Sequence, residues 1–345
     1  MIIPKGLNKG DKVAIVSLSW GGAGDGEIYN RYLTGKKRLE DVLGLEVVAM
    51  PHALKGSAYV STHPEDRAKD WMDAFRDPTI KGIISNIGGN DTIRLLPYID
   101  YEVISDNPKV FMGYSDTTVN HFMCYKAGLR SYYGPSVLME FAENVAIHDY
   151  VVEGVMRTLF SNDVIGEVEG AKMWTSDYLP WDVAENNATQ RKMLPETHGY
   201  EVLQGSGRVT GALMGGCIES VNDLRGTPLW PSLDEWQGKI LFLESSEDKP
   251  SPEAVACMLR GFWATGIIDV INGILVGKPQ GEVYYEDYKS VYKEVIGIQC
   301  GRPDLPILYN VNFGHASPIT VLPYGALAEI DCDKKSFKIL ESGVL

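Results

Sequence analysis

The chain lacks the features that mark several classes of protein. Its five cysteines are spread over 345 residues, and no two of them form a C-x-x-C pair. Neither a zinc knuckle nor a redox-active dithiol is therefore indicated, and free thiols in a reducing compartment are expected. No apolar run approaches the roughly 20 residues that a membrane-spanning helix needs. The stretch Met1–Lys5 shows no signal peptide, so we expect a cytoplasmic protein.

Positive charge is also scarce. The chain has 32 Lys and Arg against 46 Asp and Glu, which gives a formal net charge of −14 at pH 7. A surface of this sign repels phosphate backbones and anionic lipids. We therefore expect neither a nucleic acid nor a membrane as a partner, although a local pocket can still differ from the average.

What is present is an alternation of short apolar runs with helical segments in the first half of the chain. Hydrophobic residues make up 44% of the sequence and charged residues 23%, which is ordinary for a globular protein. Strands that alternate with helices predict parallel strand–helix–strand units and an α/β fold with a doubly wound sheet. The expected strands are 12–17, 45–50, 82–86 and 109–113, and the expected helices are 27–43, 64–76, 92–98 and 116–127.

A change in pattern divides the chain into three parts. Periodicity is poor from about Asp163 to Gly207, although two tryptophans there argue against disorder. We therefore expect an N-terminal α/β domain over residues 1–165, a connecting loop over 166–207, and a second α/β domain with more antiparallel strands over 208–345. Expected elements of the second domain are strands at 239–244, 270–276, 307–311, 325–330 and 336–340, and helices after 216, at 252–265 and at 287–296.

The strongest local signal for chemistry is the stretch Lys109–Thr118, KVFMGYSDTT. A buried strand ends, Ser115 follows, and a helix starts at once. This is the geometry of a nucleophile elbow, in which a sharp turn exposes the serine hydroxyl beside a helix N-terminus. Thr117 replaces the second glycine of G-x-S-x-G, so the match is partial. On local sequence alone, capping of the helix by Ser115 or Asp116 is the simpler explanation.

A nucleophilic serine needs a base and an acid that orients it. His315 directly follows a strand, where its side chain can project into a cleft, whereas His121 is expected to pack within its helix. Glu244 ends an apolar strand, which is a costly position for an acid unless the acid is solvated or takes part in function. Glu247 and Asp248 are rivals for this role, but their setting resembles a solvated turn. The order Ser, Glu, His occurs in other α/β hydrolases.

Paired glycines supply a candidate oxyanion hole. Gly88 and Gly89 follow a strand, and glycines let backbone amides approach a substrate oxygen closely. The amide of Asp116, directly after the candidate nucleophile, is the second donor. A plain strand-to-helix turn is the alternative.

Taken together, these stretches resemble the LD-carboxypeptidase family, including its microcin C immunity peptidases. The resemblance extends from about residue 4 to about residue 340 and depends on the order of the stretches more than on any one of them. It implies a Rossmann-like N-terminal domain, a swivelling β/α C-terminal domain, a homodimer, and no metal or cofactor. The matching stretches are 85–89, 95–100, 113–118, 133–135, 210–211, 240–244 and 314–315.

The same resemblance assigns roles to individual residues. It implies a serine-type carboxypeptidase with Ser115 as nucleophile, Glu244 as orienting acid and His315 as base. The implied amide donors are Gly89 and Asp116, with Gly88 as a further candidate. The reaction would be acyl transfer through an acyl-enzyme that water releases.

The substrate depends on the branch of the family. Ile87–Asp91, which includes the candidate substrate residue Asn90, resembles the glycine loop of the microcin C immunity peptidases more than R-G-G-x-G of murein enzymes. The segment 173–182 resembles their tryptophan loop, in which a ring stacks on a nucleobase, so Trp174 and Trp181 are candidate substrate contacts. Burial of a loop by these tryptophans is the alternative. Lys278 is a candidate partner for a phosphate or carboxylate, or a surface residue.

Three other functions stay open at this point. A murein LD-carboxypeptidase would remove the terminal D-alanine from a cell-wall tetrapeptide, rather than cut a peptidyl-nucleotide. A non-catalytic protein with two ligand-binding lobes would not need Ser115, Glu244 and His315 together. A dinucleotide oxidoreductase is disfavoured because the glycines of Gly21–Gly26 do not fit G-x-G-x-x-G.

Overall fold

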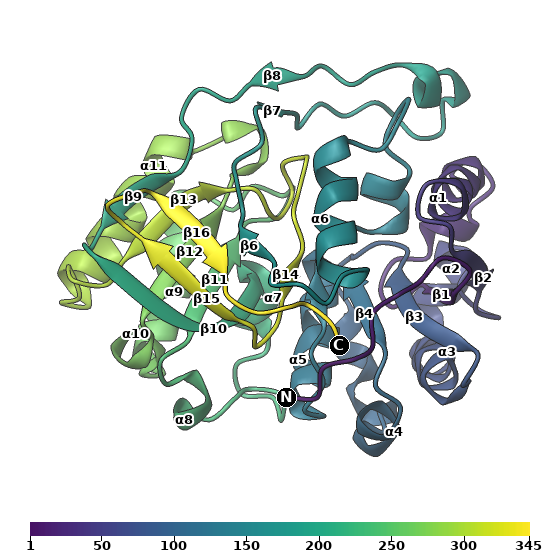
Figure 1. The fold of residues 1–345 in the computed structure, drawn as a ribbon, viewed down its shortest axis with the longest axis horizontal. Helices are drawn as coiled ribbons and strands as arrows, with labels where there is room; N and C mark the ends of the chain where they lie inside the picture. Colours follow the sequence, from purple (N-terminus) through teal and green to yellow (C-terminus); the bar gives the residue numbers. More distant parts are fainter.

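Two large β-sheets lie side by side in the computed structural model, which describes residues 1–345 (Figure 1). The first sheet has the order β14-β5-β4-β3-β1-β2. Strands β1 to β5 are all parallel, and only β14 runs antiparallel to its neighbour. The predicted doubly wound α/β fold is therefore confirmed. The strands are β1 (Lys12–Val16), β2 (Glu46–Ala49), β3 (Ile80–Ser85), β4 (Val110–Gly113), β5 (Tyr132–Tyr133) and β14 (Leu322–Pro323).

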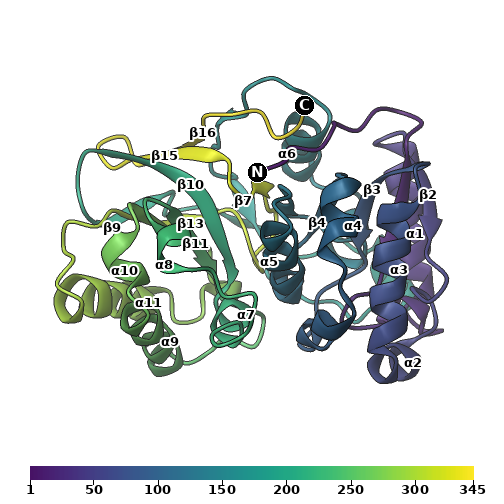
Figure 2. The same cartoon turned by 90° about the horizontal axis from the view of Figure 1, so that it is seen from below.

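Helices cover both faces of this sheet because each central strand is apolar on both sides. Val13 and Ile15 pack with α1 and α6, whereas Ala14 and Val16 pack with α3, α4 and α5, as the two-residue period of a strand requires. Figure 2 shows α3, α4 and α5 along one face of the sheet. The helices around this sheet are α1 (Tyr29–Asp41), α2 (Ser57–Thr62), α3 (Pro64–Arg76), α4 (Tyr101–Asp106), α5 (Thr118–Lys126) and α6 (Asp149–Leu159).

The second sheet has eight strands in the order β6-β16-β15-β10-β11-β12-β13-β9. Its centre, β10 to β13, is parallel, and antiparallel strands extend it at both sides. The strands are β6 (Gly166–Glu167), β9 (Glu201–Gln204), β10 (Arg208–Cys217), β11 (Ile240–Glu244), β12 (Gly273–Gly277), β13 (Ile307–Val311), β15 (Leu327–Asp331) and β16 (Ser336–Ile339). The helices are α7 (Ile218–Asp223), α8 (Leu233–Trp236), α9 (Pro252–Ala264), α10 (Ile267–Val270) and α11 (Tyr285–Tyr292).

The two sheets are joined by a close contact at Gly216 and by a strand, β14, that comes from the C-terminal part of the chain. Gly216 on β10 has φ of 143°, and a Cβ at this position would lie 2.5 Å from the Thr118 side chain at the start of α5. A glycine is therefore needed for this close approach. Strand β14 comes from the C-terminal part of the chain, yet it pairs with β5 at the edge of the first sheet.

The connecting segment is more structured than its sequence indicates. Strands β6 and β9 lie within the predicted loop 166–207 and join opposite edges of the second sheet, and β7 (Met173–Trp174) pairs with β8 (Leu194–Pro195). Thr175 and Ser317 exchange two backbone hydrogen bonds of 2.7 and 3.0 Å. The segment is thus fixed to the body of the protein beside the loop of His315. None of the helices combines the length and apolarity that crossing a bilayer would need.

Candidate active site

The candidate catalytic residues come from the carboxyl ends of three parallel strands. Ser115 follows β4 of the first sheet, Glu244 ends β11 of the second, and His315 follows β13. In open α/β sheets, ligands bind in the crevice outside the carboxyl ends of the strands. The structure therefore brings the three predicted residues together across the boundary between the two sheets, although Glu244 and His315 lie far from Ser115 in sequence.

Ser115 occupies a strained turn between β4 and α5. Its φ is 63°, in the left-handed region that residues with a side chain rarely adopt. Its backbone N–H donates to the hydroxyl of Tyr133 over 3.1 Å. Strain of this kind persists where the surroundings hold it, and it is the conformation that a nucleophile elbow requires.

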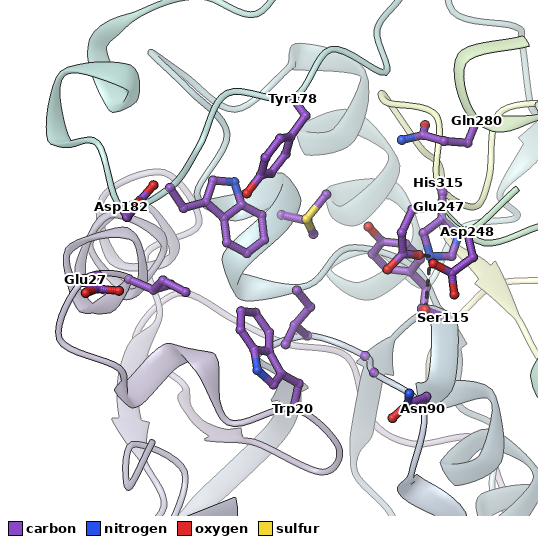
Figure 3. Close-up of a pocket in the computed structure, with 17 residues that line it drawn as sticks. Trp20, Glu27, Asn90, Ser115, Tyr178, Asp182, Glu247, Asp248, Gln280 and His315 are labelled. Carbon is purple, nitrogen blue, oxygen red and sulfur yellow. Dashed lines mark hydrogen bonds and ion pairs between the residues drawn. The ribbon is translucent and has the colours of Figure 1, made fainter. Parts of the chain in front are cut away.

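A chain of hydrogen bonds joins the three residues. The Oγ of Ser115 lies 3.1 Å from Nε2 of His315, and Nδ1 of His315 lies 2.7 Å from Oε2 of Glu244 (Figure 3 shows the first two residues). The Glu244 side chain is fully buried, and its second oxygen accepts a hydrogen bond from the hydroxyl of Tyr133. The carboxylate is therefore fixed at both oxygens, which holds the imidazole in one orientation.

Close packing against Glu244 explains why a glycine, Gly314, precedes His315. Its φ is 97°, and a Cβ there would lie 2.5 Å from Oε2 of Glu244. Any larger residue would therefore displace the carboxylate from the imidazole of His315. The predicted Gly–His pair has this steric reason in addition to its place at a strand end.

His315 is flanked by two carboxylates. Besides Glu244, Oε2 of Glu247 lies 3.0 Å from Nε2, the nitrogen that also faces Ser115. Burial alone would lower the pKa of His315, but Glu244 and Glu247 together raise that pKa well above its usual value. The hydrogen bond to His315 lowers the pKa of Glu247 to about 2. Glu247 lies in the solvated turn expected for it, with its side chain 65% exposed, but its carboxylate also faces the site through His315.

The paired glycines lie directly against the candidate nucleophile. A Cβ at Gly88 would come within 2.7 Å of the Ser115 side chain and 3.0 Å of the amide nitrogen of Asp116. The backbone N–H groups of Gly88 and Gly89 donate no hydrogen bond within the protein. These amides are thus free to meet a substrate oxygen beside Ser115.

The side chain of Asp116 fastens the nucleophile turn to its neighbours. One carboxylate oxygen accepts hydrogen bonds from the hydroxyl of Ser19 (2.7 Å), the amide of Thr92 (2.9 Å) and the hydroxyl of Thr92 (2.7 Å). These donors lie at the ends of the loop that carries the paired glycines and of the loop after β1. The candidate oxyanion hole and the nucleophile are therefore held in a fixed relation.

A cavity of about 760 Å³ opens from Ser115 and His315 and ends at an aromatic group on the opposite side (Figure 3). The rings of Trp20 and Trp181 lie 6.4 Å apart with their planes 32° from parallel, and Tyr178 packs beside Trp181. The guanidinium of Arg31 stacks 4.6 Å from the centre of the Trp181 ring. The remaining lining residues are Glu27, Ile28, Ile87, Gly88, Gly89, Asn90, Tyr114, Met139, Asp182, Glu247, Asp248 and Gln280.

Two of the predicted substrate residues lie outside this cavity. Trp174 is only 4% exposed, and the ammonium of Lys278 lies 4.2 Å from the centre of its ring. The same ammonium is buried and bonds to Glu196 at 3.0 Å and to Glu282 at 2.6 Å. The two carboxylates already neutralise Lys278, so the structure gives neither it nor Trp174 a route to substrate. Trp181 and Asn90, by contrast, line the cavity.

Several residues of the site have no role in the sequence-based prediction. Trp20 follows β1, and its position at the carboxyl end of a parallel strand is a signal that could have placed it at the same edge as Ser115. Tyr133 belongs to a stretch that matches the family, but nothing in its local sequence indicates hydrogen bonds to both Ser115 and Glu244. Gln280 reaches the cavity from the second sheet.

Comparison with known proteins gives two family matches. Residues 13–134 match the LD-carboxypeptidase N-terminal domain, and residues 210–330 match the LD-carboxypeptidase C-terminal domain. Ser115 lies in the first match, and Glu244 and His315 lie in the second. The matches cover most of the chain and leave out the connecting segment.

Individual relatives extend over nearly the whole chain. Microcin C7 self-immunity protein MccF of Escherichia coli is 28% identical over 315 residues, 90% of this chain and 88% of that protein. The probable murein peptide carboxypeptidase of Bacillus subtilis is 27% identical over 349 residues, 99% of this chain and 95% of that protein. An MccF-like protein from Streptococcus pneumoniae in complex with AMP has a TM-score of 0.88 at 35% identity, covering 95% of this chain and 98% of its own. MccF in complex with aspartyl sulfamoyl adenosine has a TM-score of 0.86 at 25% identity over the full length of both chains.

Proposed function

The chain belongs to the LD-carboxypeptidase family of serine peptidases, and we propose that it hydrolyses the amide bond between an aminoacyl or peptidyl group and a nucleotide. In this proposal Ser115, His315 and Glu244 form the catalytic triad. The observation that carries it is the continuous hydrogen-bond chain from the strained Ser115 through His315 to the buried Glu244. A protein that only bound ligands would have no use for a strained serine beside an oriented imidazole.

The proposed reaction follows from the geometry. Nε2 of His315 accepts the proton of Ser115 as Oγ attacks the carbonyl carbon, and then gives it to the departing nitrogen. Glu244 accepts a hydrogen bond from Nδ1 and stabilises the imidazolium that forms. The amides of Gly89 and Asp116, with Gly88 next to them, stabilise the negative charge on the former carbonyl oxygen. Water then repeats the sequence and releases the acyl group.

The aromatic end of the cavity supports a nucleotide as the leaving group. A cavity of about 760 Å³ lies in the range of small-molecule sites, and it extends from Ser115 to Trp20 and Trp181. A nucleobase would have a ring to stack on there, worth roughly 1–3 kcal/mol. Two relatives of similar fold bind AMP and aspartyl sulfamoyl adenosine, and both ligands contain adenosine, which supports a nucleotide leaving group here.

A murein tetrapeptide is the second candidate substrate. The Bacillus subtilis relative named as a probable murein peptide carboxypeptidase favours it, because that relative covers 99% of this chain. Against it stands the leaving group, a single D-alanine, which would leave the tryptophans of the cavity without contact. The two candidates differ in what lies beyond the scissile bond, and one assay can separate them.

The experiment offers wild type and Ser115→Ala an alanyl sulfamoyl adenosine and a murein tetrapeptide, and follows cleavage by mass spectrometry. We expect cleavage of the conjugate by wild type and a loss of at least about a thousandfold in Ser115→Ala. Ser290→Ala, an exposed serine on α11, is the matched control and should keep full activity. Cleavage of the tetrapeptide alone would move the enzyme to cell-wall turnover. A variant Ser115→Ala that matched wild type would overturn the triad.

A further inference from the structure

We propose that Glu247 receives the free α-ammonium group of the acyl half of the substrate, so that the enzyme selects uncapped aminoacyl groups and disfavours acidic ones. This inference rests on the proposed function and specifies the substrate of the same site. It concerns the side of the scissile bond opposite to the tryptophans.

The position of Glu247 is the first step. Its carboxylate lies 3.0 Å from Nε2 of His315, which in turn lies 3.1 Å from Oγ of Ser115. In an aminoacyl substrate the α-nitrogen is two bonds from the carbonyl carbon, about 2.5 Å away. That carbon sits roughly 3–3.5 Å from Oγ before attack. An acyl group whose α-carbon is turned toward His315 therefore brings its ammonium within reach of the Glu247 carboxylate.

The charge of the cavity is the second step. Its lining contains four carboxylates and neither lysine nor arginine. Figure 3 shows Glu247 and Asp248 beside Ser115 and His315, whereas Glu27 and Asp182 lie on the side of Trp20. An ammonium near Ser115 meets opposite charge, whereas a carboxylate on the same acyl group meets like charge and finds no lysine or arginine in the lining to pair with.

The contact between Glu247 and His315 also affects the availability of the base. In the unliganded structure Nε2 of His315 faces both Glu247 and Ser115, and it has one site for a proton or a hydrogen bond. While Nε2–H donates to Glu247, that nitrogen cannot take the proton of Ser115. The side chain of Glu247 is 65% exposed and therefore has room to turn. A substrate ammonium that draws the carboxylate away frees Nε2 to act as the base.

The test compares alanyl sulfamoyl adenosine with its N-acetyl-alanyl counterpart, which differs only in the charge and cap of the amine. For wild type we expect kcat/KM to favour the free amine by at least about tenfold, in line with a charged hydrogen bond. In Glu247→Gln this ratio should fall below about threefold. Glu27→Gln changes the same type of residue at the far end of the cavity, and its ratio should match that of wild type.

The outcomes separate this inference from the proposed function. Equal cleavage of the two conjugates by wild type, or an unchanged ratio in Glu247→Gln, would overturn the role of Glu247 and leave the proposed function standing. No cleavage of either conjugate would overturn both.

A second pair of substrates tests the acyl side chain. Aspartyl and asparaginyl sulfamoyl adenosine are close in shape and differ in charge. Wild type should prefer the asparaginyl conjugate by about tenfold, and Glu247→Gln combined with Asp248→Asn should reduce this preference. MccF has been crystallised with aspartyl and glutamyl sulfamoyl nucleosides, which carry acidic acyl groups. A preference of this enzyme for the aspartyl conjugate would contradict the role proposed for Glu247.

Discussion

The two ends of the cavity are built in opposite ways. At the reaction end, Glu244 and His315 are 0% and 7% exposed, and each is held by hydrogen bonds to residues from other strands. At the aromatic end, Trp20 is 36% exposed and Tyr178 is 66% exposed, and both lie on loops. The reaction end depends on two sheets that must pack together, whereas the aromatic end depends on segments that lie over them.

This difference indicates how the two ends respond to change. A substitution at the reaction end leaves a buried partner unsatisfied, which is costly for both stability and chemistry. The loop that carries Trp181 is fastened separately, through ion pairing of Arg191 with the buried Glu143 and hydrogen bonds from Asn144 to the backbone of Asn186 and Thr189. Its ring can therefore be replaced without disturbing the triad, so we expect kcat to report on one end and KM on the other.

Glu244→Gln should have the largest effect among the tests of this comparison. The amide can no longer favour the imidazolium of His315, so kcat should fall by about 10³–10⁴-fold, as for the acid of other triads. Steady-state kinetics and thermal unfolding would be measured together. Glu253→Gln, an exposed glutamate at the start of α9, is the control. A kcat within tenfold of wild type in folded Glu244→Gln would remove Glu244 from the mechanism.

Trp181→Ala should have a smaller effect, confined to binding. Loss of a stacked ring is worth roughly 1–3 kcal/mol, so KM for a nucleotide conjugate should rise about 5- to 150-fold while kcat changes little. The control is Trp174→Phe, because Trp174 belongs to the same segment but is buried outside the cavity. If kcat fell as far as KM rose, the two ends would be coupled and the comparison would fail.

The pH profile should show the smallest effect. In the proposed mechanism neutral His315 is the base, and its pKa is raised, so kcat/KM should increase with pH as this histidine loses its proton. The groups that face it are Glu244, Glu247, Ser115 and the ring of Tyr114. Removing one negative charge lowers the pKa of His315, so Glu247→Gln should move the acid limb of the profile to lower pH.

The control for the pH profile is Asp248→Asn. This residue lines the cavity but makes no hydrogen bond to His315. An unchanged acid limb in Glu247→Gln, or an equal shift in Asp248→Asn, would mean that Glu247 does not act on His315 directly.

The parallel core and the candidate triad residues could be predicted from the sequence for a physical reason. Apolar runs and their period report on burial, which is local, and helix α3 begins at Pro64 and ends at Arg76 as predicted. Ser115, Glu244 and His315 follow or end such strands, and the carboxyl ends of parallel strands share an edge. Their assignment as one group still required the resemblance to a family, because no local pattern links residues from two sheets.

The residues proposed to contact the substrate could be predicted less well from the sequence, because their surroundings depend on contacts between distant segments. Nothing near Lys278 in sequence indicates that Glu196 and Glu282 neutralise it, or that Trp174 packs under its ammonium. Trp20 joins Trp181 only through the folding of two loops. Glu247 was expected in solvent because its turn is polar, and its contact with His315 follows from the return of the chain after β13.

The pairing of β14 with β5 has a consequence for how the protein is made. Strand β5 is Tyr132–Tyr133, and its partner Leu322–Pro323 is synthesised only after six of the eight strands of the second sheet. Until then the first sheet has an open edge beside the hydroxyl that will hold Ser115 and Glu244. A shortened chain that ends at or before β13 therefore lacks both the closing strand and His315. The proposed triad therefore stays incomplete in the nascent chain until translation is nearly complete.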